Sequence, residues 1–161
     1  GIFLGEEYLF DQVRAGICLY GTSPSKDKAV MIYPVVSLQS QIAHICHIKN
    51  ETNIGYGASY SLQPGMVTAT IPIGYADGYF RCLSNKGHCY INEFKVPIIG
   101  AISMDLLSLD VTHLPESYRR IGQKVELIGP NVSVETVASM ANTISYEILT
   151  SMRHRYNREY I

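Results

Sequence analysis

The chain has 161 residues, enough for a buried core, and its 47% apolar and 17% charged residues are typical of a globular protein. A formal net charge of −1 gives neither the basic excess of a nucleic-acid groove nor an acidic tail. No apolar run approaches the roughly 18 residues of a membrane helix, since residues 31–36 are too few and include Pro34. We therefore expect neither a nucleic acid nor a membrane as partner.

The start of the chain and its cysteines indicate its context. Gly1 is not a natural initiator and no signal-peptide pattern follows, so we expect a piece that begins inside a larger protein. The four cysteines (Cys18, Cys46, Cys82 and Cys89) form no CxxC pair, and we interpret them as reduced thiols, as in the cytoplasm. A Cys82–Cys89 disulfide across a hairpin is the weaker alternative.

The first half of the chain reads mainly as β-structure. Residues 12–20 are predicted to form a buried strand, which ends at the breaker cluster 21–25. Residues 29–48 are predicted to form a long β stretch because β-branched residues alternate with polar ones. The polar, glycine-rich segment 51–57 is predicted to be a loop, and residues 67–73 another strand.

The second half adds an irregular segment, short strands and helices. The glycine-rich segment 74–87 is predicted to be extended and irregular, a type of segment that is often functional. Ser133 is placed to cap a helix over 134–141, and 153–161 reads as a mobile terminus. Further short strands are predicted at 88–91, 96–99, 105–111 and 124–128, and a second short helix at 146–152. The fold class is therefore mostly β, a compact sandwich or small barrel with one or two short helices.

Two groups of residues invite a reading as sites. His44 and Cys46 would lie on one face of a strand and His47 on the other, so only two ligands converge, and we predict no metal site.

The chain also has twelve tyrosines against four phenylalanines. The tyrosines that lie next to Gly, Ser or Asp are Tyr56, Tyr60, Tyr75, Tyr79 and Tyr146. They indicate either a wet pocket or partly exposed packing, because a buried tyrosine hydroxyl needs a partner.

Six segments together resemble one family. In chain order they are 13–21 (VRAGICLYG), 54–61 (IGYGASYS), 71–78 (IPIGYADG), 99–105 (IGAISMD), 124–129 (KVELIG) and 144–148 (ISYEI). In order and spacing they resemble the C-terminal half of pyridoxal-phosphate-dependent alanine racemases.

The resemblance implies a division of the chain and a partner. Residues 1–25 would be the end of a (β/α)8 barrel, and residues 26–161 the C-terminal β domain. In this family the barrel holds pyridoxal phosphate on a lysine, and the β domain of the partner subunit closes the pocket, which implies a homodimer. That lysine is expected upstream, so the chain alone is expected to hold no cofactor and to be inactive.

By the same resemblance, Tyr56 is the catalytic residue. Racemisation needs acid/base groups on both faces of the substrate α-carbon, and Tyr56 would serve one face while the lysine serves the other. An ordinary phenol has a pKa of about 10, so such a site must favour the phenolate or relay the proton. The alternative for Tyr56 is a structural loop tyrosine.

The resemblance also implies cofactor contacts. Arg14 would face the pyridine nitrogen, and because arginine hardly releases its proton, the nitrogen would stay unprotonated. The alternative for Arg14 is an ion pair with Asp11 or Glu7. The remaining contacts are to the phosphate, from the backbone amides of Gly16 and Ile17 and the hydroxyl of Tyr146.

Three further residues are implied in substrate binding. The backbone amide of Met104 would receive the substrate carboxylate, while Tyr75 and Arg81 would line the entrance. Ala101 and Ser103 stand where some members carry Arg and Cys, which lowers the expected charge of the entrance.

The function implied is interconversion of L-alanine and D-alanine for peptidoglycan precursors. Two alternatives stay open, a non-catalytic β module for dimerisation or binding and a broader-specificity amino-acid racemase.

Overall fold

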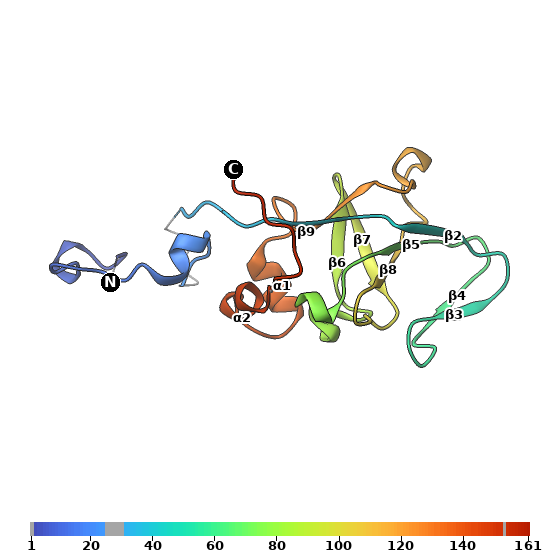
Figure 1. Ribbon diagram of the computed structural model, residues 1–161, viewed down its shortest axis with the longest axis horizontal. Coiled ribbons are helices and arrows are strands. Elements are labelled where there is room, and N and C mark those ends of the chain that lie inside the picture. Colours follow the sequence, from blue (N-terminus) through green and yellow to red (C-terminus); the bar gives the residue numbers. More distant parts are fainter. Residues whose placement is uncertain (1, 25–30, 153) are drawn as a thin grey trace.

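A computed structural model describes residues 2–24, 31–152 and 154–161 as a curled β-sheet with a small hairpin and two helices beside it (Figure 1). The strands are β1 (Leu38–Gln41), β2 (His44–His47), β3 (Thr52–Ile54), β4 (Tyr60–Leu62), β5 (Val67–Ile71), β6 (His88–Ile91), β7 (Phe94–Ile99), β8 (Leu107–Asp110) and β9 (Lys124–Ile128). The α-helices are α1 (Val134–Met140) and α2 (Ser145–Ser151), and short 3-10 helices span Glu6–Tyr8, Gly16–Tyr20, Tyr75–Asp77, Arg81–Leu83 and Glu116–Tyr118.

The main sheet has seven antiparallel strands in the order β1-β9-β6-β7-β8-β5-β2, so β1 and β2 stand at its two ends. Only Ile42 and Ala43 separate these two strands in sequence. The amide of Ile42 donates to Gln123 O at 2.9 Å, and that of Ala43 donates to Thr70 O at 2.9 Å. One continuous segment thus joins both ends of the sheet and curls it into a small barrel, which confirms the predicted mostly-β class.

The core fills the inside of this barrel. Each long strand sends alternate apolar side chains inward, as the period of a strand requires, and fully buried examples are Ile71, Ile91, Val96, Leu109 and Val125. The buried face of α1 belongs to the same cluster. Burial on this scale makes the barrel a rigid support for the loops at its rim.

The helices follow their sequence signals closely. Ser133 Oγ accepts a hydrogen bond from the Thr136 amide at 3.2 Å, the N-cap that the sequence predicted.

The strands predicted at 67–73, 88–91 and 124–128 are also confirmed within two residues. None of the helices in the described ranges is long and apolar enough to span a membrane.

The predicted strand at 12–20 is wrong. Its second half is the 3-10 helix Gly16–Tyr20, in which Ile17 is the buried residue, and the first half is exposed. This N-terminal region extends away from the barrel (Figure 1), so its apolar residues have no strand to pair with among the described residues. Residue 25 of the breaker cluster 21–25 lies outside the described residues.

Other boundaries also differ from the prediction. Part of the predicted loop 51–57 is a strand, because Thr52–Ile54 pairs with Tyr60–Leu62. The long stretch 29–48 contains strand only from Leu38 onward, with residues 29 and 30 outside the described ranges. Segment 74–87 is irregular as predicted but includes two 3-10 helices. The predicted strand 105–111 narrows to Leu107–Asp110.

Candidate active-site surface

Tyr56 lies in the turn that joins β3 to β4. Three positive φ angles bend this turn, at Gly55 (81°), Gly57 (68°) and Ala58 (53°), and the Ala58 amide donates to Gly55 O at 3.2 Å. The Tyr56 side chain is 70% exposed. A glycine on either side therefore allows a tight turn that presents a phenol outward instead of packing it.

The Tyr56 turn is fastened to the loop that follows β7. Ser59 Oγ accepts from the Ala101 amide at 2.8 Å, and Asn85 bridges the two by donating to Ser59 O at 3.1 Å and accepting from the Gly100 amide at 2.6 Å. A Cβ at Gly55 would lie 2.5 Å from Ala101 N, so only glycine permits this approach. These contacts hold in place the backbone turn that carries the exposed phenol.

An open hollow of about 470 Å³ lies beside Tyr56. Its wall includes Tyr56, Thr70, Ala101, Ser103 and Leu106, which come from three separate segments of the chain. The small residues Ala101 and Ser103 leave the wall uncharged where they stand, as the sequence indicated. The hollow is large enough for a small amino acid.

Met104 follows on the same loop and is 52% exposed. Its carbonyl accepts from the Ala76 amide at 3.0 Å, and the carbonyl of Ser103 accepts from the Tyr75 amide at 3.0 Å. The backbone amide of Met104 has no acceptor among the described residues. It is therefore an uncommitted donor at the predicted carboxylate contact.

Tyr75 is brought beside Met104 by a close backbone contact. A Cβ at Gly74 would lie 2.3 Å from Met104 O, and the Gly74 amide donates to Asp77 Oδ2 at 2.8 Å. Tyr75 is about half exposed next to this contact. The 74–78 loop and the 103–106 loop therefore form one unit that carries both predicted substrate residues.

Tyr146 and Gly16 also meet, although they come from opposite ends of the chain. The Tyr146 hydroxyl lies 3.8 Å from the position that a Cβ would take at Gly16, and Tyr146 is 48% exposed. Gly16 has φ of 61° and an exposed backbone, while the adjacent Ile17 side chain is buried. A hydroxyl donor over a side-chain-free backbone fits a phosphate group.

Two predicted site residues are not joined to the others. The side chains of Arg14 and Arg81 are exposed and form no hydrogen bond or ion pair within residues 2–24, 31–152 and 154–161. The alternative ion pair of Arg14 with Glu7 or Asp11 is therefore not formed. Both guanidinium groups are free to contact a ligand.

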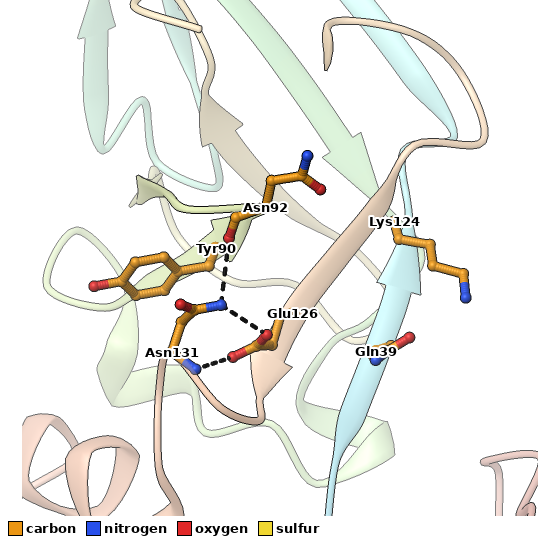
Figure 2. A pocket seen from close by; sticks show the side chains of 6 residues that line it. All are labelled: Gln39, Tyr90, Asn92, Lys124, Glu126 and Asn131. Atoms are coloured by element: carbon orange, nitrogen blue, oxygen red, sulfur yellow. Dashed lines mark hydrogen bonds between the residues drawn. The ribbon is translucent and has the colours of Figure 1, made fainter.

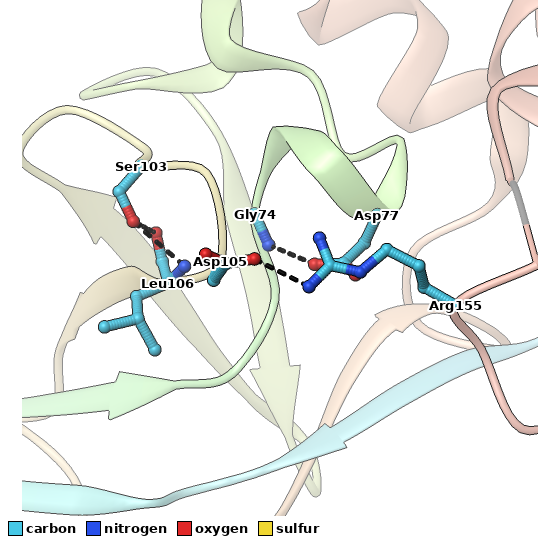
Figure 3. A network of polar contacts seen from close by, with 6 residues as sticks. All are labelled: Gly74, Asp77, Ser103, Asp105, Leu106 and Arg155. Carbon is cyan, nitrogen blue, oxygen red and sulfur yellow. Dashed lines mark hydrogen bonds and ion pairs between the residues drawn. The ribbon is translucent and has the colours of Figure 1, made fainter.

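Sequence reasoning missed one part of this surface. Residues 153–161 were expected to be a mobile terminus, but Arg155 forms ion pairs with Asp77 at 3.2 Å and Asp105 at 2.6 Å (Figure 3). Residue 153 itself lies outside the described residues. No local pattern marks such a contact, because its partners are far apart in sequence.

A second, smaller hollow of about 230 Å³ lies over β1, β6 and β9 (Figure 2). Its central residue, Glu126, accepts from the Asn131 amide at 2.7 Å, from Asn131 Nδ2 at 3.1 Å and from the Val132 amide at 3.2 Å. Asn131 Nδ2 also donates to Asn92 O at 3.3 Å. These bonds hold the turn after β9, so we interpret Glu126 as structural.

The described residues contain no cluster of three or more His, Cys, Asp or Glu side chains that is arranged for a metal ion. All four cysteines are free thiols, and Cys82, at the surface, is not bonded to the buried Cys89. The arrangement instead offers a phenol, a free backbone amide and a hydroxyl above an open backbone.

Comparison with known proteins shows the family of the chain. The profile of the family described as alanine racemase, C-terminal domain, matches residues 35–160. The alanine racemases of Rickettsia canadensis (strain McKiel) and of Brucella canis are 44% and 43% identical to the chain and match 99% and 100% of it. These matches cover 43% and 44% of the relatives, so the chain spans less than half their length.

Solved structures agree with the sequence matches. The crystal structure of alanine racemase from Bartonella henselae with covalently bound pyridoxal phosphate superposes with a TM-score of 0.93 at 45% identity, over 100% of this chain and 45% of that one. The alanine racemase from Bacillus anthracis with bound L-Ala-P gives 0.77 at 33% identity, over 86% of this chain and 36% of that one. The chain therefore belongs to the alanine racemase family and corresponds to its C-terminal domain.

Proposed function

We propose that this chain is the C-terminal part of a pyridoxal-phosphate-dependent enzyme that interconverts L-alanine and D-alanine, and that Tyr56 is its contribution to proton transfer. The observation that carries the proposal is the exposed Tyr56 phenol, fixed on a glycine-bounded turn beside a hollow large enough for a small amino acid. A tyrosine with only a structural role would gain more from burial than from this exposure.

The chemistry asks for two acid/base groups. Inversion at an α-carbon requires that a proton leave one face and another arrive at the opposite face. Tyr56 supplies one of these groups, and a lysine outside this chain supplies the other. Pyridoxal phosphate, when bound, delocalises the negative charge that develops on the α-carbon.

The residues that would hold this cofactor fit its phosphate. The Tyr146 hydroxyl and the exposed backbone at Gly16 lie next to each other, and the Ile17 amide follows in the chain. Arg14 would accompany the ring nitrogen as a donor that keeps its own proton. The Met104 amide would receive the substrate carboxylate, with Tyr75 and Arg81 at the entrance.

The wider assignments follow from the family. We propose that residues 1–25 end a (β/α)8 barrel, that the enzyme is a homodimer in the cytoplasm, and that its D-alanine serves peptidoglycan synthesis. The four free thiols support a reducing compartment.

The direct test is Tyr56→Phe in the full-length protein. Removing the phenol hydroxyl should lower kcat for alanine racemisation by about 10²–10⁴-fold, the usual contribution of a general acid/base, with cofactor absorbance retained. Tyr90→Phe is the matched control, because Tyr90 lies on the other hollow, and it should leave kcat unchanged. A Tyr56→Phe enzyme with normal kcat contradicts the proposal.

Two further arms complete this test. The 161-residue chain alone should show no turnover, because the second acid/base group lies outside it, and turnover by the purified chain would contradict that assignment. A panel of other L-amino acids with the full-length enzyme distinguishes an alanine racemase from one of broader specificity.

A further inference from the structure

The ion pairs of Arg155 join the two loops that carry the substrate residues. Its Nε lies 3.2 Å from Asp77 Oδ1, and its Nη2 lies 2.6 Å from Asp105 Oδ1 (Figure 3). Asp77 belongs to the 74–78 loop and is 7% exposed, whereas Asp105 directly follows Met104 and is exposed. One guanidinium therefore ties a carboxylate on each loop to the C-terminal segment.

Each of the two loops also has hydrogen bonds of its own. Asp77 Oδ2 accepts from the Gly74 amide at 2.8 Å, so both oxygens of the Asp77 carboxylate are engaged. In the 103–106 loop, Ser103 Oγ donates to Leu106 O and accepts from the Leu106 amide, both at 2.9 Å. These two bonds close the loop around Met104 and Asp105. Arg155 thus acts on two loops that are already ordered internally.

The geometry needs an arginine. Two different nitrogens of one planar group reach two different carboxylates, and a lysine, with one nitrogen, cannot reproduce that fork. The contact with Asp105 also spans 50 positions of the chain. An ion pair this exposed contributes little to global stability, so its effect is expected in the position of the loops.

We propose that Arg155 is a positioning residue that fixes the 74–78 and 103–106 loops to each other and thereby sets the place of the uncommitted Met104 amide. This inference rests on the proposed function, because it assigns the Met104 amide to the substrate carboxylate. Contact with the carboxylate is made in the ground state and the transition state alike, so its loss raises KM more than it lowers kcat.

The kinetic test uses Arg155→Gln in the full-length holoenzyme. KM for alanine should rise by about tenfold while kcat changes by less than about threefold, the pattern of lost uniform binding. Arg155→Lys should recover little of the lost substrate affinity, because lysine restores the charge but has only one nitrogen to reach the two carboxylates. Arg120→Gln is the control, since Arg120 is exposed and its side chain makes no polar contact with the described residues, and it should leave KM unchanged.

A second readout does not depend on activity. The Tyr75 and Ala76 amides donate to the 103–106 loop, so their hydrogen exchange reports whether the two loops stay joined. Arg155→Gln should accelerate this exchange by about tenfold relative to Arg120→Gln, because local opening becomes more frequent. Asp105→Asn should do the same, and the double variant Arg155→Gln/Asp105→Asn should add little, because both remove one interaction.

The outcomes separate the two proposals. Unchanged exchange in Arg155→Gln overturns the positioning role, as does a loss of kcat at constant KM, which would indicate a merely structural effect. An inactive wild-type holoenzyme would overturn the proposed function, and in that case hydrogen exchange alone decides the role of Arg155.

Discussion

At the scale of single residues, the surface depends on glycines that permit contacts no other residue would allow. Gly55 lets the Tyr56 turn approach Ala101, and Gly74 lets the Tyr75 loop approach Met104. Both contacts place backbone against backbone, so the neighbouring side chains are free to face a ligand. Tyr56 and Tyr75, the residues to which we assign roles in the site, are exposed next to these glycine contacts.

Gly74→Ala tests this at one position. Gly74 has an extended backbone, φ −151°, which any residue adopts, so the cost of a methyl group there comes only from overlap with Met104 O at 2.3 Å. We expect the free energy of unfolding to fall by about 1–3 kcal/mol, as for other overpacked sites, measured by urea denaturation. Equal stability of Gly74→Ala and wild type would contradict the close approach.

At the scale of elements, the helices and strands with strong local signals could be predicted from the sequence. Features that depend on a partner distant in the chain could not. Ser133 and the apolar spacing behind it predicted α1, and short runs bounded by turn residues predicted β6 and β9, because each signal lies within a few residues. Residues 12–20 have the composition of a buried strand, but a strand also needs a neighbour, and composition says nothing about that. Arg155 was missed for the same reason, since its partners are distant in sequence.

The cap of α1 gives a prediction at this scale. Ser133→Ala removes the acceptor of the Thr136 amide and should lower the free energy of unfolding by about 1 kcal/mol. Ser139→Ala, an exposed position on the same helix, should change it by no more than a few tenths of a kcal/mol. Thermal unfolding of both variants is the measurement, and equal effects would argue against the cap.

The hairpin of β6 and β7 gives a prediction about pH. The pKa of His88 is lowered from its ordinary value of 6.5, mainly because the ring is partly buried and to a lesser extent because the positive charge of Lys95 is nearby. The unfolded chain then binds a proton at this site more readily than the folded chain, so stability is retained above pH 6.5 and lost as pH falls below it. His88→Asn should flatten the fall in stability between about pH 8 and about pH 5. The measurement is the free energy of unfolding of both proteins across this range, each relative to its own value at pH 8. The same loss in His88→Asn as in wild type would contradict the assignment.

At the scale of the whole molecule, the candidate site draws on distant segments of the chain, and we propose that it is completed by a second subunit. The resemblance located Tyr56, Met104, Tyr75 and Tyr146 by motif, and the fold places them on joined loops and on α2, next to Gly16 from the other end of the chain. What the sequence could not supply is the tertiary contact that holds those loops, because hydrogen bonds between backbone groups leave no trace in residue identity. Because the proposed lysine would come from outside this chain, catalysis would require Tyr56 to meet it in the assembled enzyme.

We propose that Tyr56 completes a site in a partner subunit, and mixing two inactive full-length variants tests this role most directly. One variant carries Tyr56→Phe, and the other carries a substitution of the cofactor-binding lysine. If each site takes its tyrosine and its lysine from different subunits, random exchange yields heterodimers with one intact site, and activity should return to about one quarter of wild type. If the mixture stays inactive after subunit exchange has been verified, Tyr56 does not act across the dimer and the account is wrong.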